Sequence, residues 1–112
     1  MRPIEKERLH HIKHAIQRIG THTAGLEEAS FVKNEVVIDA VLFQFSIIGE
    51  AVGYINKDLL TRYPYPWHLV RAFRNYIALE YFGINLKLVW QTVKQDLPVI
   101  STLVNQMIKN EF

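Results

Sequence analysis

Apolar residues at three- and four-residue steps predict a first helix from about Ile4 to Ile19. The apolar stripe of this helix consists of Leu9, Ile12, Ile16 and Ile19. Steps of three and four residues place these side chains on one helical face. Gly20 and residues 21–25 interrupt the pattern with small and polar side chains. We therefore expect the helix to end at this point and a loop to follow it.

A second helix, from about Phe31 to Ile55, is predicted to be apolar on most of its sides. The apolar side chains that cannot share one stripe are Val36, Val37, Ile38, Val41, Leu42, Phe43, Phe45, Ile47 and Ile48. Such a helix needs cover on several faces, and in a chain of 112 residues a second copy can supply part of it. This pattern favours a homodimer.

The most apolar stretch, Glu35–Val52, is also interrupted by Asp39, Gln44, Ser46 and Glu50. A bilayer span needs about 20 predominantly apolar residues. We therefore interpret this stretch as a buried helix and expect no membrane association.

Residues 56–65 are mostly polar, Pro64 lies near their end and Pro66 follows directly, which predicts a connector. A third helix is expected from Trp67 to about Phe82, with Pro66 at its first turn and Gly83 after its end.

Asn85 has a side chain suited to capping the last helix. The apolar seam of that helix comprises Leu86, Val89, Trp90, Val93, Leu97, Ile100, Val104 and Met107. Pro98 lies within the seam and is expected to kink or restart the helix near Asp96. The whole pattern predicts one all-α domain over residues 1–112, a bundle of about four to five helices.

Composition narrows the functional classes. The net charge of +2 permits nucleic-acid binding without requiring it. With no cysteine, the sequence excludes disulfides, thiol nucleophiles and cysteine-based zinc sites. The absence of cysteine also fits a reducing cytoplasm. The charged residues 1–8 contain no apolar segment, so no signal peptide is expected. His10 and His14 stand four apart, but no nearby carboxylate or cysteine completes a metal site, so none is predicted.

Segment 74–81 carries a spaced motif formed by Arg74, Asn75, Leu79 and Tyr81. Short strings accompany it in order along the chain: Arg8-Leu9-His10-His11-Ile12, Ile48-Gly49-Glu50-Ala51, Pro66-Trp67, Tyr81-Phe82-Gly83-Ile84-Asn85, Val89-Trp90 and Leu97-Pro98. The ordered set resembles the HepT-like branch of the HEPN ribonucleases over most of the chain. Members of that branch have histidine at the position of Leu79.

The resemblance implies an HEPN-type helical bundle that forms a homodimer, with the two motifs facing each other across the two-fold axis. It also implies a prokaryotic, cytoplasmic toxin of a type VII-like toxin–antitoxin pair. HepT-like toxins cut RNA without a metal or another cofactor. Their partner is an MntA-type nucleotidyltransferase, which disarms the toxin by transferring AMP from ATP to the motif tyrosine.

Each motif position then has an implied role. Arg74 would hold the scissile phosphate, Asn75 would orient neighbouring groups, and Tyr81 would accept AMP. Position 79 should supply an imidazole, whose pKa of about 6.5 suits proton transfer near neutral pH. Leucine cannot transfer protons, and loss of a general acid/base typically lowers a rate by about 10²–10⁴-fold.

The sequence leaves open a structural helical dimer unrelated to RNA, and Leu79 leaves two further functional readings open. One is a toxin inactivated recently or by engineering, and the other is a non-catalytic helical dimer that serves as the binding partner or modification substrate of a nucleotidyltransferase. In a regular helix, residues 74 and 79 point about 140° apart, whereas residues 74 and 81 lie nearly on one line. A distorted helix end or a second subunit would therefore be needed to bring Arg74 and position 79 together.

Glu50 interrupts an apolar helix, and a buried carboxylate is unfavourable without a partner. Arg74 is the partner that we expect for it. Outside the motif, Arg74 would be an ordinary salt-bridged helix residue and Tyr81 an aromatic at the edge of the core.

Overall fold

Helix α1 (Pro3–Thr23) opens the fold and extends one turn beyond its predicted end. The computed structural model describes residues 3–112. Gly20 does not break the helix, because a glycine inside a helix costs only about 1 kcal/mol relative to alanine. The apolar stripe continues from the buried Ile19 to the buried Thr23, whose hydroxyl donates to the Ile19 carbonyl at 2.8 Å.

The predicted second helix corresponds to α3 (Glu35–Gly53), which starts four residues later than predicted and ends two residues earlier. Phe31, its predicted start, is the last residue of a separate short helix, α2 (Glu28–Phe31). Asn34 sets the division, because its side-chain oxygen accepts a hydrogen bond from the Val37 N–H at 3.1 Å and caps α3. Phe31 belongs to the short α2, is fully buried and packs against Trp90 with ring centroids 5.1 Å apart.

The predicted connector contains a short helix, α4 (Lys57–Thr61). The sequence did not predict this helix, because its residues are mostly polar and show no apolar stripe. Asn56 caps it by accepting a hydrogen bond from the Asp58 N–H at 2.7 Å. Helix α5 (Trp67–Leu79) follows, and Pro66 is its N-cap residue rather than part of its first turn.

The end of α5 differs from its prediction, because the helix stops at Leu79 and a 3₁₀ turn, η1 (Tyr81–Gly83), follows. Asn85 caps α6 (Leu86–Gln91) by accepting from the Leu88 N–H at 3.1 Å, which confirms its predicted role. A π-helical segment, η2 (Thr92–Asp96), then leads into α7 (Leu97–Glu111). Pro98 lies in the first turn of α7, so the predicted restart near Asp96 is confirmed.

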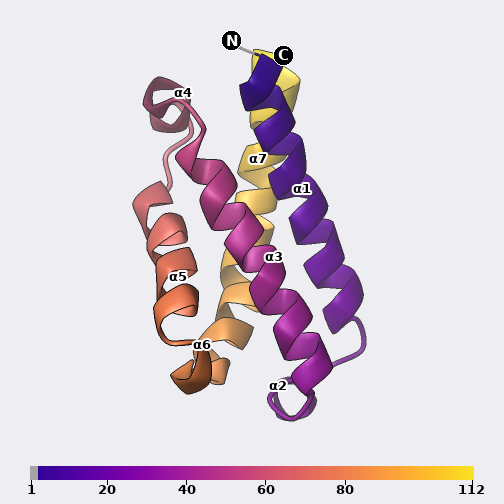
Figure 1. Cartoon of the computed structure of the whole chain (residues 1–112). Coiled ribbons are helices and arrows are strands. Elements are labelled where there is room, and N and C mark those ends of the chain that lie inside the picture. The colour runs from indigo at the N-terminus through magenta and orange to yellow at the C-terminus, as the bar shows by residue number, and fades with distance from the viewer. Residues whose placement is uncertain (1–2) are drawn as a thin grey trace.

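Helix α3 lies between α1 and α5, and α7 packs against α1 (Figure 1). The four long helices α1, α3, α5 and α7 and the absence of strands from residues 3–112 confirm the all-α bundle. Their buried faces form one core, which includes Leu9, Ile12, Val41, Phe45, Ile48, Val89 and Val104.

Helix α3 is long and apolar enough to cross a membrane by length and composition alone. Half of its most apolar window is nevertheless buried inside the bundle. This burial agrees with the interpretation of α3 as a core helix.

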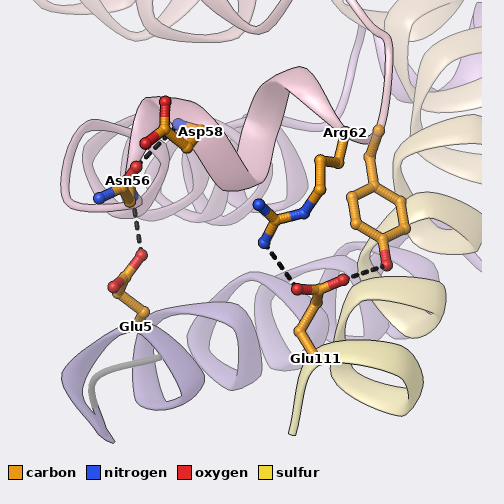
Figure 2. Close-up of polar contacts among 6 residues, drawn as sticks. Glu5, Asn56, Asp58, Arg62 and Glu111 are labelled. Atoms are coloured by element: carbon orange, nitrogen blue, oxygen red, sulfur yellow. Dashed lines mark hydrogen bonds and ion pairs between the residues drawn. The ribbon is translucent and has the colours of Figure 1, made fainter.

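Polar contacts hold both ends of the described chain against the region around α4 (Figure 2). The buried Glu5 of α1 accepts a hydrogen bond from the Asn56 N–H at 2.9 Å. Glu111, at the end of α7, accepts from Arg62 at 2.7 Å and from the Tyr63 hydroxyl at 3.0 Å. Residues distant in the sequence are thereby tied together beside α4.

These contacts predict a pH-dependent contribution to stability. The hydrogen bond from Arg62, reinforced by that from Tyr63, lowers the pKa of Glu111 below its usual value. A carboxyl whose pKa is lowered by folding stabilises the protein above its unfolded-state pKa, and the contribution is lost as pH falls through the folded-state pKa. We expect Glu111→Gln to lower the free energy of unfolding slightly at neutral pH and less in acid, as measured by urea unfolding. An equal loss at both pH values would contradict this expectation.

Candidate functional site

Helices α3 and α5 pack tightly together where Gly49 lies against Arg74. A Cβ atom added at Gly49 would collide with the Arg74 Cβ and would lie 3.0 Å from the Arg74 Cγ and 3.1 Å from the Val70 carbonyl oxygen. Glycine therefore lets the backbone of α3 approach the base of the Arg74 side chain.

The Arg74 guanidinium lies between two polar side chains. Its Nη2 is 3.7 Å from Glu50 Oε2, and its Nη1 donates to Asn75 Oδ1 at 3.3 Å. The predicted contact with Glu50 is thus present, but the predicted burial of that carboxylate is wrong, because the Glu50 side chain is 54% exposed. A cation at the surface whose ion pair is loose remains available to an anionic ligand.

A polar hollow of about 190 Å³ surrounds this cluster. It is lined by Gly49, Glu50, Gly53, Tyr54, Arg71, Arg74 and Asn75. The sequence motif contains only two of these residues, Arg74 and Asn75. Arg71 precedes them by one helical turn, and this spacing was the sequence signal that could have identified it.

Leu79 is the last residue of α5, and its side chain is 81% exposed. Since α5 is continuous from Arg74 to Leu79, the two side chains point about 140° apart, as predicted for one regular helix. A single copy of the chain does not bring position 79 to the Arg74 cluster.

Tyr81 lies outside α5, so the predicted alignment of Arg74 and Tyr81 along one helix is wrong. The Tyr81 hydroxyl instead donates a hydrogen bond to Asp39 Oδ1 at 2.7 Å. This hydrogen bond, together with the negative charges of Asp39 and Glu35, raises the pKa of Tyr81. Asp39 is a site candidate that the motif did not reveal.

The contacts of Tyr81 and Arg74 with α3 are well separated. Tyr81 meets the helix at Asp39 and Arg74 meets it at Glu50, eleven residues later. At 1.5 Å per residue, these two positions are roughly 16 Å apart along the helix axis. The structure therefore presents an arginine cluster and a tyrosine–aspartate pair as two distinct sites.

Large apolar side chains are exposed around the tyrosine–aspartate pair. Val36 and Phe43, one turn before and one turn after Asp39 on α3, are 80% and 64% exposed. Phe82, the neighbour of Tyr81, is fully exposed. Exposed apolar residues gathered in this way are typical of a surface that binds another protein.

A second cavity, of about 420 Å³, is apolar and is lined by residues of α3, α5, α6, η2 and α7 and by Tyr65 and Pro66 before α5. Its wall includes Tyr65, whose hydroxyl donates to Asp96 at 3.1 Å. Burial, followed by this hydrogen bond and the charge of Asp96, raises the pKa of Tyr65 to about 12. None of the motif residues lines this cavity. Among residues 3–112, no three histidine, aspartate or glutamate side chains gather as a candidate metal site.

A family model described as "Ribonuclease HepT-like" matches residues 12–107. "Putative RNase MJ1380" of Methanocaldococcus jannaschii is 38% identical over 79 residues, which cover 70% of this chain and 72% of the relative. "Putative RNase TTE0752" of Caldanaerobacter subterraneus is 28% identical over 92% of this chain and 93% of the relative. "Probable ribonuclease HepT" of Thermococcus cleftensis is 31% identical over 88% and 90%, respectively. No solved structure matches the chain at a significant level.

Proposed function

Because this chain belongs to the ribonuclease HepT-like family, we propose that it is a metal-independent endoribonuclease toxin whose acid/base position is occupied by Leu79. The observation that carries the proposal is the exposed Arg74 guanidinium, held by Glu50 and Asn75 at the edge of a polar hollow. Cleavage of RNA by the Leu79→His protein, but not by the present chain, tests it.

The proposed cleavage begins when the 2′-hydroxyl oxygen of RNA attacks the adjacent phosphorus. One group must accept the proton of this hydroxyl, and another must protonate the 5′-oxygen as its bond to phosphorus breaks. Arg74 binds the phosphate and stabilises the charge that accumulates on its oxygens in the transition state. Leu79 supplies neither proton transfer, so the present chain retains the phosphate-binding part of the site and lacks the acid/base part.

We propose that the complete site forms between two copies of the chain. Within one copy, Arg74 and position 79 diverge along the continuous helix α5. A two-fold arrangement removes this difficulty, because position 79 of each copy can approach Arg74 of the other. The exposed Val36, Phe43 and Phe82 supply apolar surface for such an interface.

The tyrosine–aspartate pair suits the proposed modification by an MntA-type nucleotidyltransferase. In that reaction the Tyr81 oxygen attacks the α-phosphorus of ATP, the bond to the β-phosphate breaks, and pyrophosphate leaves. A tyrosine phenol is protonated at neutral pH even at its ordinary pKa of about 10, and the hydrogen bond to Asp39 raises the pKa of Tyr81 further. The reaction therefore benefits from a group that accepts the phenol proton. Asp39 Oδ1, at 2.7 Å, is placed to accept it.

The transfer can be followed by intact-protein mass spectrometry with ATP, Mg²⁺ and an MntA-type nucleotidyltransferase. We expect AMP transfer to Tyr81, no transfer to the Tyr81→Phe protein, and a rate lower by about 10²-fold or more for Asp39→Asn, as expected for loss of a general base. Modification of Tyr81→Phe at an undiminished rate would remove Tyr81 as the acceptor.

The exposed apolar surface around Tyr81 also supports the second candidate function, a non-catalytic dimer that serves as a binding partner or modification substrate. This candidate predicts AMP transfer to Tyr81 together with intact RNA, even for the Leu79→His protein. The two functions are therefore separated by RNA cleavage, not by AMP transfer.

A further inference from the structure

The polar hollow contains a half-exposed aromatic ring that the motif does not explain. Tyr54, the residue after α3, lines the hollow and is 52% exposed. The Arg8 guanidinium lies over its ring, 4.2 Å from the centroid. A stacked guanidinium steadies the ring and adds positive charge beside it. Nucleic-acid bases stack on aromatic side chains presented in this way.

Arg71 is a second cation in the same hollow. A Cβ added at Gly53 would lie 3.2 Å from the Arg71 Nε and 3.3 Å from its Cζ, so Arg71 rests against the α3 backbone where glycine leaves room. Gly53 therefore leaves room for the Arg71 side chain against α3, just as Gly49, four residues earlier, leaves room for that of Arg74. The two arginines are one helical turn apart on α5, a spacing comparable with that of neighbouring phosphates along a single strand.

The charges around the hollow favour an anion. Two arginines, Arg71 and Arg74, and one carboxylate, Glu50, line the hollow. The Arg8 guanidinium adds a further positive charge where it lies over the Tyr54 ring, so positive charge exceeds negative charge around the hollow. Glu50 interacts with Arg74 and not, within ion-pair distance, with Arg71. Among residues 3–112, no carboxylate lies within ion-pair distance of Arg71, so its charge is free to bind an anion.

We propose that Arg71 and Tyr54 form a subsite for the nucleotide next to the scissile phosphate of single-stranded RNA. Arg71 binds the neighbouring phosphate, and the base of that nucleotide stacks on Tyr54. The inference rests on the proposed function, because it extends the RNA contact from Arg74 along the same hollow. It assigns RNA binding to residues outside the motif.

Binding of a short fluorescently labelled single-stranded RNA, followed by anisotropy over a range of salt concentrations, tests the subsite. The present chain can be used directly, because Leu79 leaves the RNA uncut. We expect Tyr54→Ala to weaken binding by about tenfold to a hundredfold, in line with the loss of one stacked base. Tyr54→Phe retains the ring and should bind as the unchanged chain does.

Arg71→Ala should weaken binding and reduce the slope of log K against log salt by about 0.7, the value for one phosphate contact with a single strand. Lys33→Ala is the matched control, since it removes one positive charge just before α3, at the end opposite Gly53. Circular dichroism verifies that each variant is folded.

The outcomes separate the subsite from the proposed function. If the unchanged chain binds RNA and Arg71→Ala and Tyr54→Ala bind it as well as Lys33→Ala does, the subsite is wrong and the proposed RNA substrate stands. If the unchanged folded chain does not bind RNA, the proposed function and the subsite fail together.

Discussion

Replacing Leu79 with histidine is expected to raise the rate of RNA cleavage by about 10²–10⁴-fold, the usual contribution of a general acid/base. The substitution should not disturb the fold, because the Leu79 side chain is 81% exposed and surface changes usually alter stability by less than about 0.5 kcal/mol. Initial rates on a labelled RNA, measured between about pH 5 and pH 8, should change with the ionisation of the new imidazole.

Leu79→Asn is the matched control for this substitution. Asparagine is polar and fits the same exposed position, but it does not titrate in this range. Its rate should remain at the level of the unchanged chain at every pH. Equal rates for the histidine and asparagine variants would mean that position 79 has no acid/base role.

Gly49→Ala is expected to destabilise the protein by about 1–3 kcal/mol, the usual effect of overpacking a close contact. The new methyl group would collide with the Arg74 Cβ and press on the Val70 carbonyl oxygen, so α3 and α5 would have to separate. The same movement would displace Arg74 from Glu50. Urea unfolding monitored by circular dichroism measures the change.

Gly20→Ala provides the control, because Gly20 also lies inside a helix but a Cβ there meets no atom within 4 Å. Alanine at this position should stabilise the protein by about 0.4–1 kcal/mol, since it restricts the unfolded chain without strain. Opposite signs for the two substitutions would establish that the close approach at Gly49, not helix propensity, decides the effect. Stabilisation by both would contradict the tight contact beneath Arg74.

Much of the bundle could be predicted because its signals are local. The apolar stripes located the long helices, Asn85 identified the start of α6, and Pro98 identified the restart at α7. These local signals did not predict the places where one or two residues determine where a helix starts, ends or continues. Asn34 divides α2 from α3, Asn56 caps a short helix in a polar stretch, and Gly20 is accommodated inside α1.

The candidate site could be predicted in part for the same reason. The pairing of Arg74 with Glu50 could be predicted, because a carboxylate within an apolar helix needs a positively charged partner. The Glu50 carboxylate is nevertheless exposed. The contact between Tyr81 and Asp39 joins residues 42 positions apart and depends on where α5 ends. Arg71 and Tyr54 share a hollow only because Gly53 lets α5 approach α3. Such contacts depend on helix packing, which one-dimensional periodicity does not specify.

RNA cleavage in EDTA by three purified proteins tests the proposed nuclease most directly. These are the unchanged chain, Leu79→His, and Leu79→His combined with Arg74→Ala. All three are compared at equal concentration, and their mass in solution is measured to determine whether each is a dimer. We predict cleavage by Leu79→His alone, because it combines the phosphate-binding arginine with an imidazole. Intact RNA with all three proteins, when all are folded and dimeric, would contradict the nuclease and leave the modified binding module as the function of this chain.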